Sequence, residues 1–268
     1  MTKNMLFDFT AANYYTGVGL DLVSGPWEQK FWIANFNSGR NDTNLAAATS
    51  GNTGQPGLNT TPAFIYYVGY YQEEYWGLES TVYLVPSTGP GAATGTTTGR
   101  LAQVEIDGNY TRGTFNFNMQ VTAGNQINGA LGIDPNTGAP MDSTWYGLST
   151  MVSKVLGSNW VVAGRMDYLN NQSNGGGIFP LVLSGTNPGG VVGDVVNGFI
   201  QDPADPTGTT GTNRAALTFA ATYRLNPNAA LRGELRRDFA STSAFYNWNS
   251  GTYQSTNNTV GLQAIVNF

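Results

Sequence analysis

Apolar and polar residues alternate along much of the chain. Between Ala102 and Tyr110 the odd-numbered positions carry Gln, Glu, Asp and Asn, while most even-numbered positions are apolar. Between Phe115 and Thr122 Phe, Phe, Met and Val alternate with Asn, Asn, Gln and Thr. The segment from Arg214 to Leu225 has a similar pattern. A period of two predicts β-strands with one face toward an apolar medium and the other toward water.

Turn residues divide the patterned segments into hairpins. The pattern predicts eleven strands: Tyr15–Val23, Trp27–Phe36, Phe64–Gln72, Trp76–Val85, Leu101–Tyr110, Thr114–Thr122, Trp145–Leu156, Trp160–Asn170, Arg214–Leu225, Ala229–Phe239 and Thr259–Phe268. Tight turns such as Ser24-Gly25-Pro26 and Asn226-Pro227-Asn228 join the pairs, and much longer Gly, Thr, Asn and Pro stretches separate them. The segments 27–36 and 64–72 are apolar on both faces, so their register cannot be read.

This regular alternation of short and long connections is typical of outer-membrane barrels. A soluble sandwich has no such requirement, and its inward face would hardly be the charged one. No run approaches the roughly 18 apolar residues that a membrane helix needs. We therefore predict a single all-β domain over residues 1–268, an antiparallel up-and-down transmembrane β-barrel in contact with the lipid of the bacterial outer membrane.

The number of strands stays open at this point. Bacterial barrels have even numbers of strands, so Lys3–Thr10 is a candidate for a twelfth. The alternative is a fragment of a larger barrel, and the N-terminus has no recognisable secretion signal.

The alternation also predicts which side chains face lipid and where the membrane interfaces lie. The residues predicted to point outward are Val104, Ile106, Phe115, Phe117, Leu217, Phe219, Leu231 and Leu235. The strand-end aromatics predicted to form two girdles are Tyr14, Tyr15, Trp27, Trp76, Trp145, Tyr146, Trp160 and Tyr168.

Composition excludes several classes of function. The 268 residues include no Cys and no His, so thiol nucleophiles, Cys-based zinc sites and the commonest general base are absent. A net charge of −5 argues against nucleic-acid binding. The loop carboxylates Asp194, Asp202 and Asp205 have no recognised calcium-loop spacing. We therefore predict no enzyme activity, no catalytic residue, no metal site and no cofactor.

The candidate pore-lining residues are the charged residues at positions that the alternation assigns to the water-facing side of the strands. They are Asp21, Glu79, Glu105, Asp107, Arg165, Arg214, Arg224, Arg232, Glu234 and Arg236, with Asp167 and Asp238 beside them. The acidic ones come from the first hairpins and the arginines from the last, which predicts a field across the lumen. The alternative is a wall of mutually satisfied ion pairs with no transport role.

Several segments resemble the OmpL-like β-barrel porin family. They run from Trp145-Tyr146-Gly147 to Tyr168, from Leu217 to Asp238, and from Thr259 to Phe268, and Tyr15-Thr16-Gly17-Val18 looks like the same family's first hairpin. The resemblance implies a porin, and this chain would be an N-terminally truncated member of the family. Alternating apolar residues that end at Phe268 are the feature that the barrel-assembly machinery is thought to read in this class.

These observations predict a water-filled channel for passive diffusion of small hydrophilic solutes or ions. A structural or adhesive barrel with a closed lumen is the alternative, and a homo-oligomer is left open. The long loop Asn171–Thr212 could either fold inward to narrow the pore or remain outside.

Overall fold

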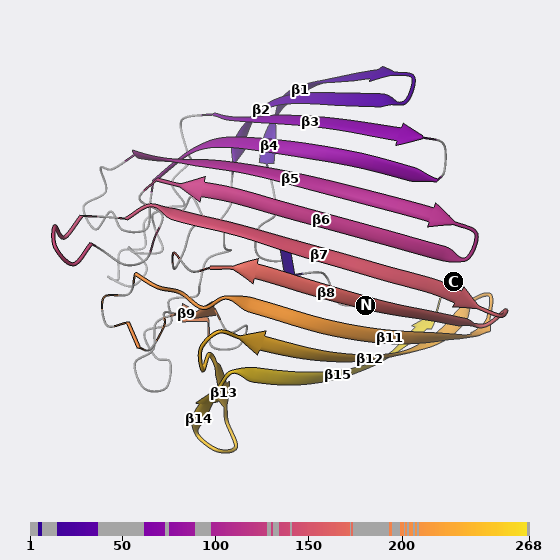
Figure 1. Cartoon of the computed structure of the whole chain (residues 1–268). Helices are drawn as coiled ribbons and strands as arrows, with labels where there is room; N and C mark the ends of the chain where they lie inside the picture. The colour runs from indigo at the N-terminus through magenta and orange to yellow at the C-terminus, as the bar shows by residue number, and fades with distance from the viewer. Residues whose placement is uncertain are drawn as a thin grey trace.

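A computed structural model of the protein describes residues 5–6, 15–36, 62–72, 75–88, 98–127, 130, 134–139, 141–171, 173, 193–194, 199–200, 202, 204–205, 207 and 209–266. Eleven of the described strands form one sheet in which consecutive strands lie side by side (Figure 1). Within these residues no helix has the length and apolar character needed to span a bilayer.

Every pair of neighbours in this sheet is antiparallel, as an up-and-down meander requires. Its strands are β1 (Tyr15–Ser24), β2 (Trp27–Phe36), β3 (Ala63–Gln72), β4 (Trp76–Thr88), β5 (Thr98–Arg112), β6 (Phe115–Gln126), β7 (Ser143–Leu156), β8 (Trp160–Asn170), β11 (Arg214–Asn226), β12 (Ala229–Ala240) and β15 (Thr256–Val266). The predicted all-β architecture and all eleven predicted segments are confirmed.

The structure extends several of the predicted strands and adds short ones. Strands β4, β5 and β6 continue several residues further toward the long loops than the alternation indicated. Two small hairpins lie in the loops: β9 (Gly193–Asp194) with β10 (Phe199–Ile200), and β13 (Phe245–Asn247) with β14 (Thr252–Gln254). Such short strands carry too few residues for a period of two to be visible.

The short connections gather at one end of the sheet, which we call the turn end, and the long ones at the opposite loop end (Figure 1). Gly25, Gly113 and Gly157 sit in three of the tight turns with φ between 56° and 61°. This left-handed conformation is the one that Gly adopts at least cost. The turns therefore fix which strands pair and in which register.

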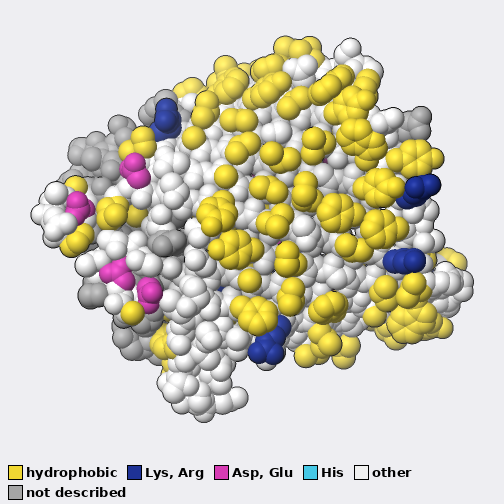
Figure 2. Space-filling view, viewed as in Figure 1, with side chains coloured by type: hydrophobic (Ala, Val, Ile, Leu, Met, Phe, Trp, Pro, Cys, Tyr) yellow, Lys and Arg dark blue, Asp and Glu magenta, His cyan; other side chains and the backbone are white. Residues whose placement is uncertain are grey.

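The two faces of the curved sheet differ in chemistry. Its outer, convex face is covered by hydrophobic side chains, and in this view acidic side chains occur only toward the loop end (Figure 2). Val260, Leu235, Phe219 and Val152 lie in one register row on this face, and Phe219 is 63% exposed. Polar and charged side chains such as Gln103 are buried on the inner face instead. This is the inverse of a water-soluble protein and the expected pattern for a wall in lipid.

The predicted outward-facing residues lie where the alternation put them. Val104, Ile106, Leu217, Phe219, Leu231 and Leu235 are all exposed on the outer face. Phe115 and Phe117 are only half-buried, but Phe117 lies directly opposite Tyr110 and Val152, two exposed outer residues.

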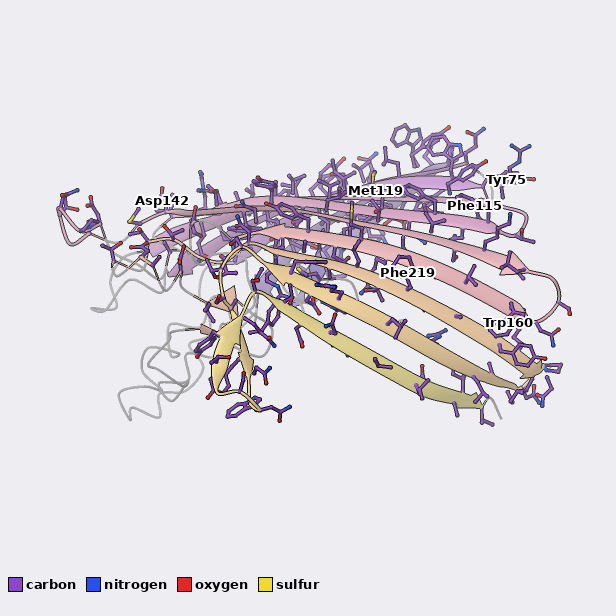
Figure 3. The ribbon with its side chains drawn as sticks, turned by 60° about the horizontal axis from the view of Figure 1, so that its bottom comes forward. Tyr75, Phe115, Met119, Asp142, Trp160 and Phe219 are labelled. Atoms are coloured by element: carbon purple, nitrogen blue, oxygen red, sulfur yellow. The ribbon has the colours of Figure 1, made fainter. Side chains whose placement is uncertain are left out.

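Aromatic residues concentrate at the turn end of the outer face. Trp27, Tyr70 and Trp76 pack in a chain with ring centroids 4.7 and 5.2 Å apart, and Trp160 packs on Tyr223 at 4.8 Å. Tyr75, Phe115 and Trp160 lie at this end, whereas Asp142 lies at the loop end (Figure 3). Such a belt matches the girdle of a membrane interface.

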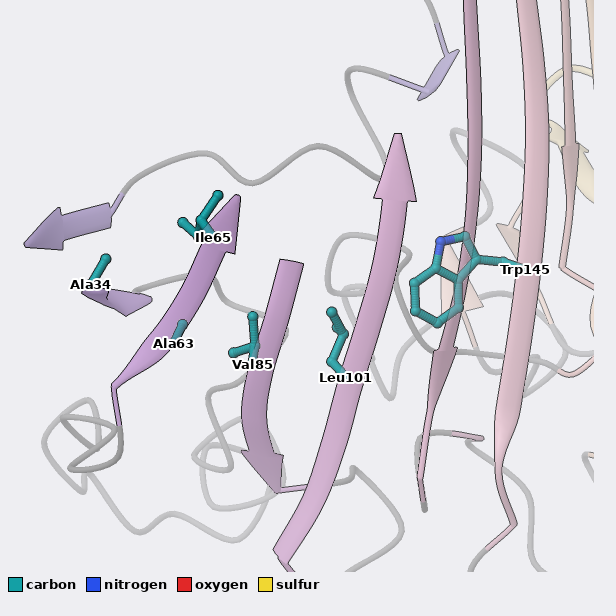
Figure 4. Close-up of a cluster of buried hydrophobic side chains, with 6 residues drawn as sticks. All are labelled: Ala34, Ala63, Ile65, Val85, Leu101 and Trp145. Atoms are coloured by element: carbon teal, nitrogen blue, oxygen red, sulfur yellow. The ribbon is translucent and has the colours of Figure 1, made fainter. Parts of the chain in front are cut away.

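The loop-end girdle is only partly as predicted. Tyr146 is exposed and lies 6.1 Å from Tyr168. Trp145, in contrast, is wrongly predicted as a girdle residue: it is 1% exposed and points inward into a buried cluster with Ala34, Ala63, Ile65, Val85 and Leu101 (Figure 4). Because Trp145 and Tyr146 are consecutive in a strand, only one of them can face lipid. Tyr14 and the side chain of Tyr15 lie outside the described residues.

Residues Met5 and Leu6 do not form the suggested twelfth strand. They take a helical turn and are buried on the inner side of the sheet. A Cβ placed on Gly147 of β7 would lie only 2.2 Å from Leu6 Cδ2, so the Leu6 side chain occupies the space over this glycine. The rest of the segment 3–10 lies outside the described residues.

Strands β1 and β15 are the two edges of the sheet among the described residues. With ten antiparallel pairings between them, these two strands run in the same direction. A barrel closed entirely by antiparallel pairing must therefore place an odd number of strands between β15 and β1. An open edge inside lipid would leave its backbone N–H and C=O groups without partners.

We predict that Phe219→Arg lowers the free energy of unfolding by about 2 to 4 kcal/mol, because it places a charge on the lipid face near the middle of β11. Ala220→Arg puts the same side chain on the inner face opposite Glu234 and should cost much less. Urea unfolding in lipid vesicles measures both values. Equal losses would contradict the assignment of the two faces.

Candidate functional site

The ten predicted pore-lining residues all occupy inner-face positions of the register. They come from β1 (Asp21), β4 (Glu79), β5 (Glu105, Asp107), β8 (Arg165), β11 (Arg214, Arg224) and β12 (Arg232, Glu234, Arg236). Asp21 and Arg224 are exposed, Glu105, Arg165 and Arg214 are buried, and the others are intermediate. The structure gathers nine of them into a basic group and an acidic group, while Asp21 lies apart on β1, opposite Lys30 of β2.

Asp238 joins two arginines at the centre of the basic group. Its Oδ1 accepts hydrogen bonds from Arg214 Nη2 and from Arg236 Nη2, each at 2.8 Å. The side chains of Arg214 and Asp238 are only 2% and 6% exposed. Arg214 also stacks on Phe245 of the β13–β14 hairpin, with its Cζ 4.4 Å from the ring centroid. Buried arginines persist only when a carboxylate balances them, so Asp238 holds this part of the wall together.

Arg165 and Asp167 repeat this arrangement on β8. Arg165 Nε donates to Asp167 Oδ2 at 2.9 Å, and Ser149 Oγ donates to Asp167 Oδ1 at 2.6 Å. The register aligns Arg165 with Thr218 and Arg236, so the two arginines lie about 10 Å apart, two strand spacings.

The remaining basic residues lie nearer the turn end. Arg232 Nε donates to Thr222 Oγ1 at 3.1 Å, and Arg224 is exposed two residues further along β11. Glu234 is half-buried beside Arg232 and Arg236. Over the inner faces of β8, β11 and β12, five arginines thus meet three carboxylates, and the local charge is positive.

The acidic group lies on β4 and β5. Glu79 is directly opposite Asp107, and Glu105 follows two residues away on the same face. No Lys or Arg occupies an inner position of these two strands among the described residues. Like charges directly opposite each other destabilise a sheet, so this arrangement keeps a negative potential at a cost in stability.

A hollow of about 610 Å³ separates the two groups. Glu79 and Asp107 line one side, Arg165 lines the other, and amide and hydroxyl side chains of β5, β6 and β7 form the floor: Asn109, Asn118, Gln120 and Ser149. Met119 and Met151 also line the hollow, so an approaching solute meets opposite charges across an uncharged surface of mixed polar and apolar character.

A third group on the inner face was missed by the sequence reasoning. Trp32, Tyr67, Tyr71 and Tyr83 point inward from β2, β3 and β4 and are half-buried. In the sequence these inward aromatics make both faces of segments 27–36 and 64–72 apolar. The alternation therefore could not show which face points inward.

The loop carboxylates serve as turn caps. Asp205 accepts hydrogen bonds from the Thr209 hydroxyl and the Thr210 amide, both at 2.7 Å, and hydrogen bonds from Thr207 and Thr209 hold the pKa of its carboxyl well below the usual value. Asp134 caps a turn in the same way, with its pKa lowered by the Asn136 amide. Among the described residues no group of three or more acidic side chains could hold a metal ion.

Comparison with known proteins places this fold and site in context. A model of one protein family matches residues 1–268, the full length of the sequence given. The chain belongs to that family, which is described as a protein of unknown function (DUF3138). The resemblance to the OmpL-like family stays a prediction beside this membership. A search of curated proteins finds no match.

Solved outer-membrane proteins share the fold. The anion-selective porin of Comamonas acidovorans superposes with a TM-score of 0.55 at 11% identity, over 97% of this chain and 64% of its own. A porin refined at 1.8 Å has 10% identity and a TM-score of 0.48, with 92% and 60% of the two chains covered. OmpT of Vibrio cholerae matches with 12% identity and a TM-score of 0.49, over 92% and 63%.

The chain of this DUF3138 protein thus spans less than two thirds of the length of these structures, and the likeness concerns the fold. The apolar outer face, the aromatic belt and the fold shared with the Comamonas acidovorans porin identify a bacterial outer-membrane protein of the β-barrel type. The predicted fold class and location are confirmed.

We predict that Asp238→Asn lowers the free energy of unfolding by about 3 to 5 kcal/mol, because it removes the buried carboxylate to which both Arg214 and Arg236 donate hydrogen bonds. Asp21→Asn removes an exposed carboxylate from β1 and should change stability by less than about 0.5 kcal/mol. Urea unfolding in vesicles compares the two. If Asp238→Asn left the free energy of unfolding unchanged, the burial of the two arginines would not depend on this carboxylate.

Proposed function

We propose that the protein is a porin that forms a water-filled channel for passive diffusion of small hydrophilic solutes or ions. The observation that carries the proposal is the inner face of the eleven-stranded sheet: apart from the apolar cluster around Trp145, it carries charged, amide, hydroxyl and aromatic side chains, while apolar side chains face lipid. A lumen packed shut like a protein core would not require a charged wall of this extent.

The size of the wall supports an open lumen. An eight-stranded barrel is just wide enough for its own side chains to fill, and porins of 16 to 18 strands leave an aqueous channel. With eleven strands in the sheet and an odd number needed for antiparallel closure, a closed barrel has at least twelve. We infer that the closing strands come from residues outside the described part or from further polypeptide.

The charges of the wall set its selectivity. Arginines on β8, β11 and β12 face acidic residues on β4 and β5 across the hollow, which creates a transverse field that orients dipolar solutes. We expect small anions to pass along the arginine side with a mild preference over cations. The C-terminal strand remains our proposed signal for the barrel-assembly machinery, with Phe268 itself outside the described residues.

Planar lipid bilayers test the channel directly. Purified protein should produce stepwise, ohmic increases in conductance in potassium chloride. A protein that inserts stably without conductance would instead be a structural barrel with a closed lumen.

We predict that Arg232→Gln combined with Arg236→Gln reduces the chloride-to-potassium permeability ratio by about sevenfold, because a local potential of about 1 kT enriches a monovalent anion about threefold and depletes a monovalent cation by the same factor. The reversal potential under a salt gradient gives this ratio. Arg237→Gln is the matched control, since Arg237 lies on the outer face of the same strand. Unchanged selectivity with intact conductance would mean that the two arginines serve as structural partners of Glu234 and Asp238.

A further inference from the structure

Aromatic residues on the inner face concentrate in one sector of the wall, and Trp145 on β7 is an inward-pointing aromatic outside that sector. Trp32, Tyr67, Tyr71 and Tyr83, which we call the aromatic track, come from the neighbouring strands β2, β3 and β4. The described inner positions of β5, β6, β8, β11, β12 and β15 include no aromatic residue. Contact with lipid explains the outer aromatics but not these, because they point away from the bilayer. Packing against the buried cluster around Trp145 covers part of Trp32 and Tyr83, but that packing does not include Tyr67 or Tyr71.

Glycines beneath the rings let them lie flat on the wall. A Cβ on Gly19 of β1 would be 2.5 Å from Trp32 Cδ2, so the indole covers this glycine. A Cβ on Gly69 or on Gly77 would be 2.8 Å from a carbon of the Tyr71 ring. A ring that lies against backbone on one side turns its other face toward the concave side of the sheet. Trp32 and Tyr71 therefore offer aromatic faces to solutes rather than ring edges.

The track runs lengthwise along the wall. Trp32 and Tyr83 both lie opposite Ile65, Tyr67 follows two residues later on β3, and Tyr71 lies four residues beyond Tyr67. From Ile65 to Tyr71 this is about 20 Å at the rise of a β-strand. A solute can therefore move from ring to ring in the direction that crosses the membrane.

Hydrogen-bonding groups flank the rings on both sides. Glu28 and Lys30 of β2 form an ion pair at 3.0 Å beside Tyr67, and Glu79 and Thr81 lie on the opposite side in β4. The hydroxyls of Tyr67 and Tyr71 are hydrogen-bonded to each other, and both tyrosines interact electrostatically with Glu28 and Glu79.

The cation position over the Tyr67 ring is already occupied. The Lys30 ammonium lies 5.1 Å from the centre of this ring, where it would repel a second cation. Glu79, with Asp107 directly opposite it, repels anions. The face of the Tyr67 ring is therefore left for uncharged solutes, while free cations are attracted to the acidic group on β4 and β5.

We propose that the aromatic track binds saccharides, neutral ring solutes whose C–H faces pack on the aromatic rings while their hydroxyls bond to Glu28, Lys30, Glu79 and Thr81. Flat apolar surfaces beside a few polar groups are the usual composition of small-molecule sites. This inference rests on the proposed channel function and names a class of solute for it, distinct from the anions attracted by the arginines.

The test is a titration of the ion current through single channels with maltotriose. Maltotriose should block the current with saturation. A polyethylene glycol of similar mass, which is neutral but has no ring, should lower the current only in proportion to its concentration.

Three variants of adjacent residues make the test specific. Tyr71→Ala should raise the maltotriose concentration needed for half-maximal block by about two- to tenfold, the range expected for loss of one aromatic contact. Tyr71→Phe keeps the ring and should retain most of the block. Tyr70→Ala removes the neighbouring tyrosine, which faces lipid, and should leave the block unchanged.

The measurements distinguish failure of the saccharide site from failure of the channel proposal. Conductance without saturable block, or equal effects of Tyr71→Ala and Tyr70→Ala, would overturn the saccharide site and leave the channel standing. If no conductance occurs, the channel proposal fails, and calorimetric titration of the detergent-solubilised protein with maltotriose decides the site alone. Binding heat that disappears in Tyr71→Ala would support it, and no heat in the unmodified protein would overturn it.

Discussion

Backbone hydrogen bonding inside lipid is the constraint on which the rest of this structure depends. Water is absent from the bilayer core, so each strand must satisfy its N–H and C=O groups through its neighbours. The tight turns make the next strand in sequence the partner, which fixes the register. Once the register is fixed, alternation assigns each side chain to lipid or to the inner face, and the distribution of charge and aromatic rings follows from it.

The inner face then becomes a surface of three sectors: aromatic on β2 to β4, acidic on β4 and β5, and basic on β8, β11 and β12. The acidic and basic sectors can occur in one sheet because carboxylates within the basic sector neutralise its buried arginines. Asp238 and Asp167 neutralise buried arginines, whereas Glu79 and Asp107 stand opposite each other without a basic residue on their own inner faces. The wall is therefore stable where it is basic and electrostatically strained where it is acidic.

The sequence predicted the strands well because period two and turn chemistry are local signals. The spacing of Arg165 and Asp167, or of Arg236 and Asp238, already puts each pair on one face. The contact of Arg214 with Asp238 depends on register between two strands and could not be read directly. Trp145 was misplaced because a strand-end position does not reveal the face, and the aromatic track was hidden because apolar residues on both faces erase the period.

The contact between Leu6 and Gly147 reduces the space inside the wall. Leu6 is buried on the concave side and fills the space that any larger residue at position 147 would need. Leu6 can reach β7 from the side while the sheet is still open, or through the loop end of the completed wall. By either route residues 5 and 6 lie against β7 on the concave side and take up part of the space that the wall encloses.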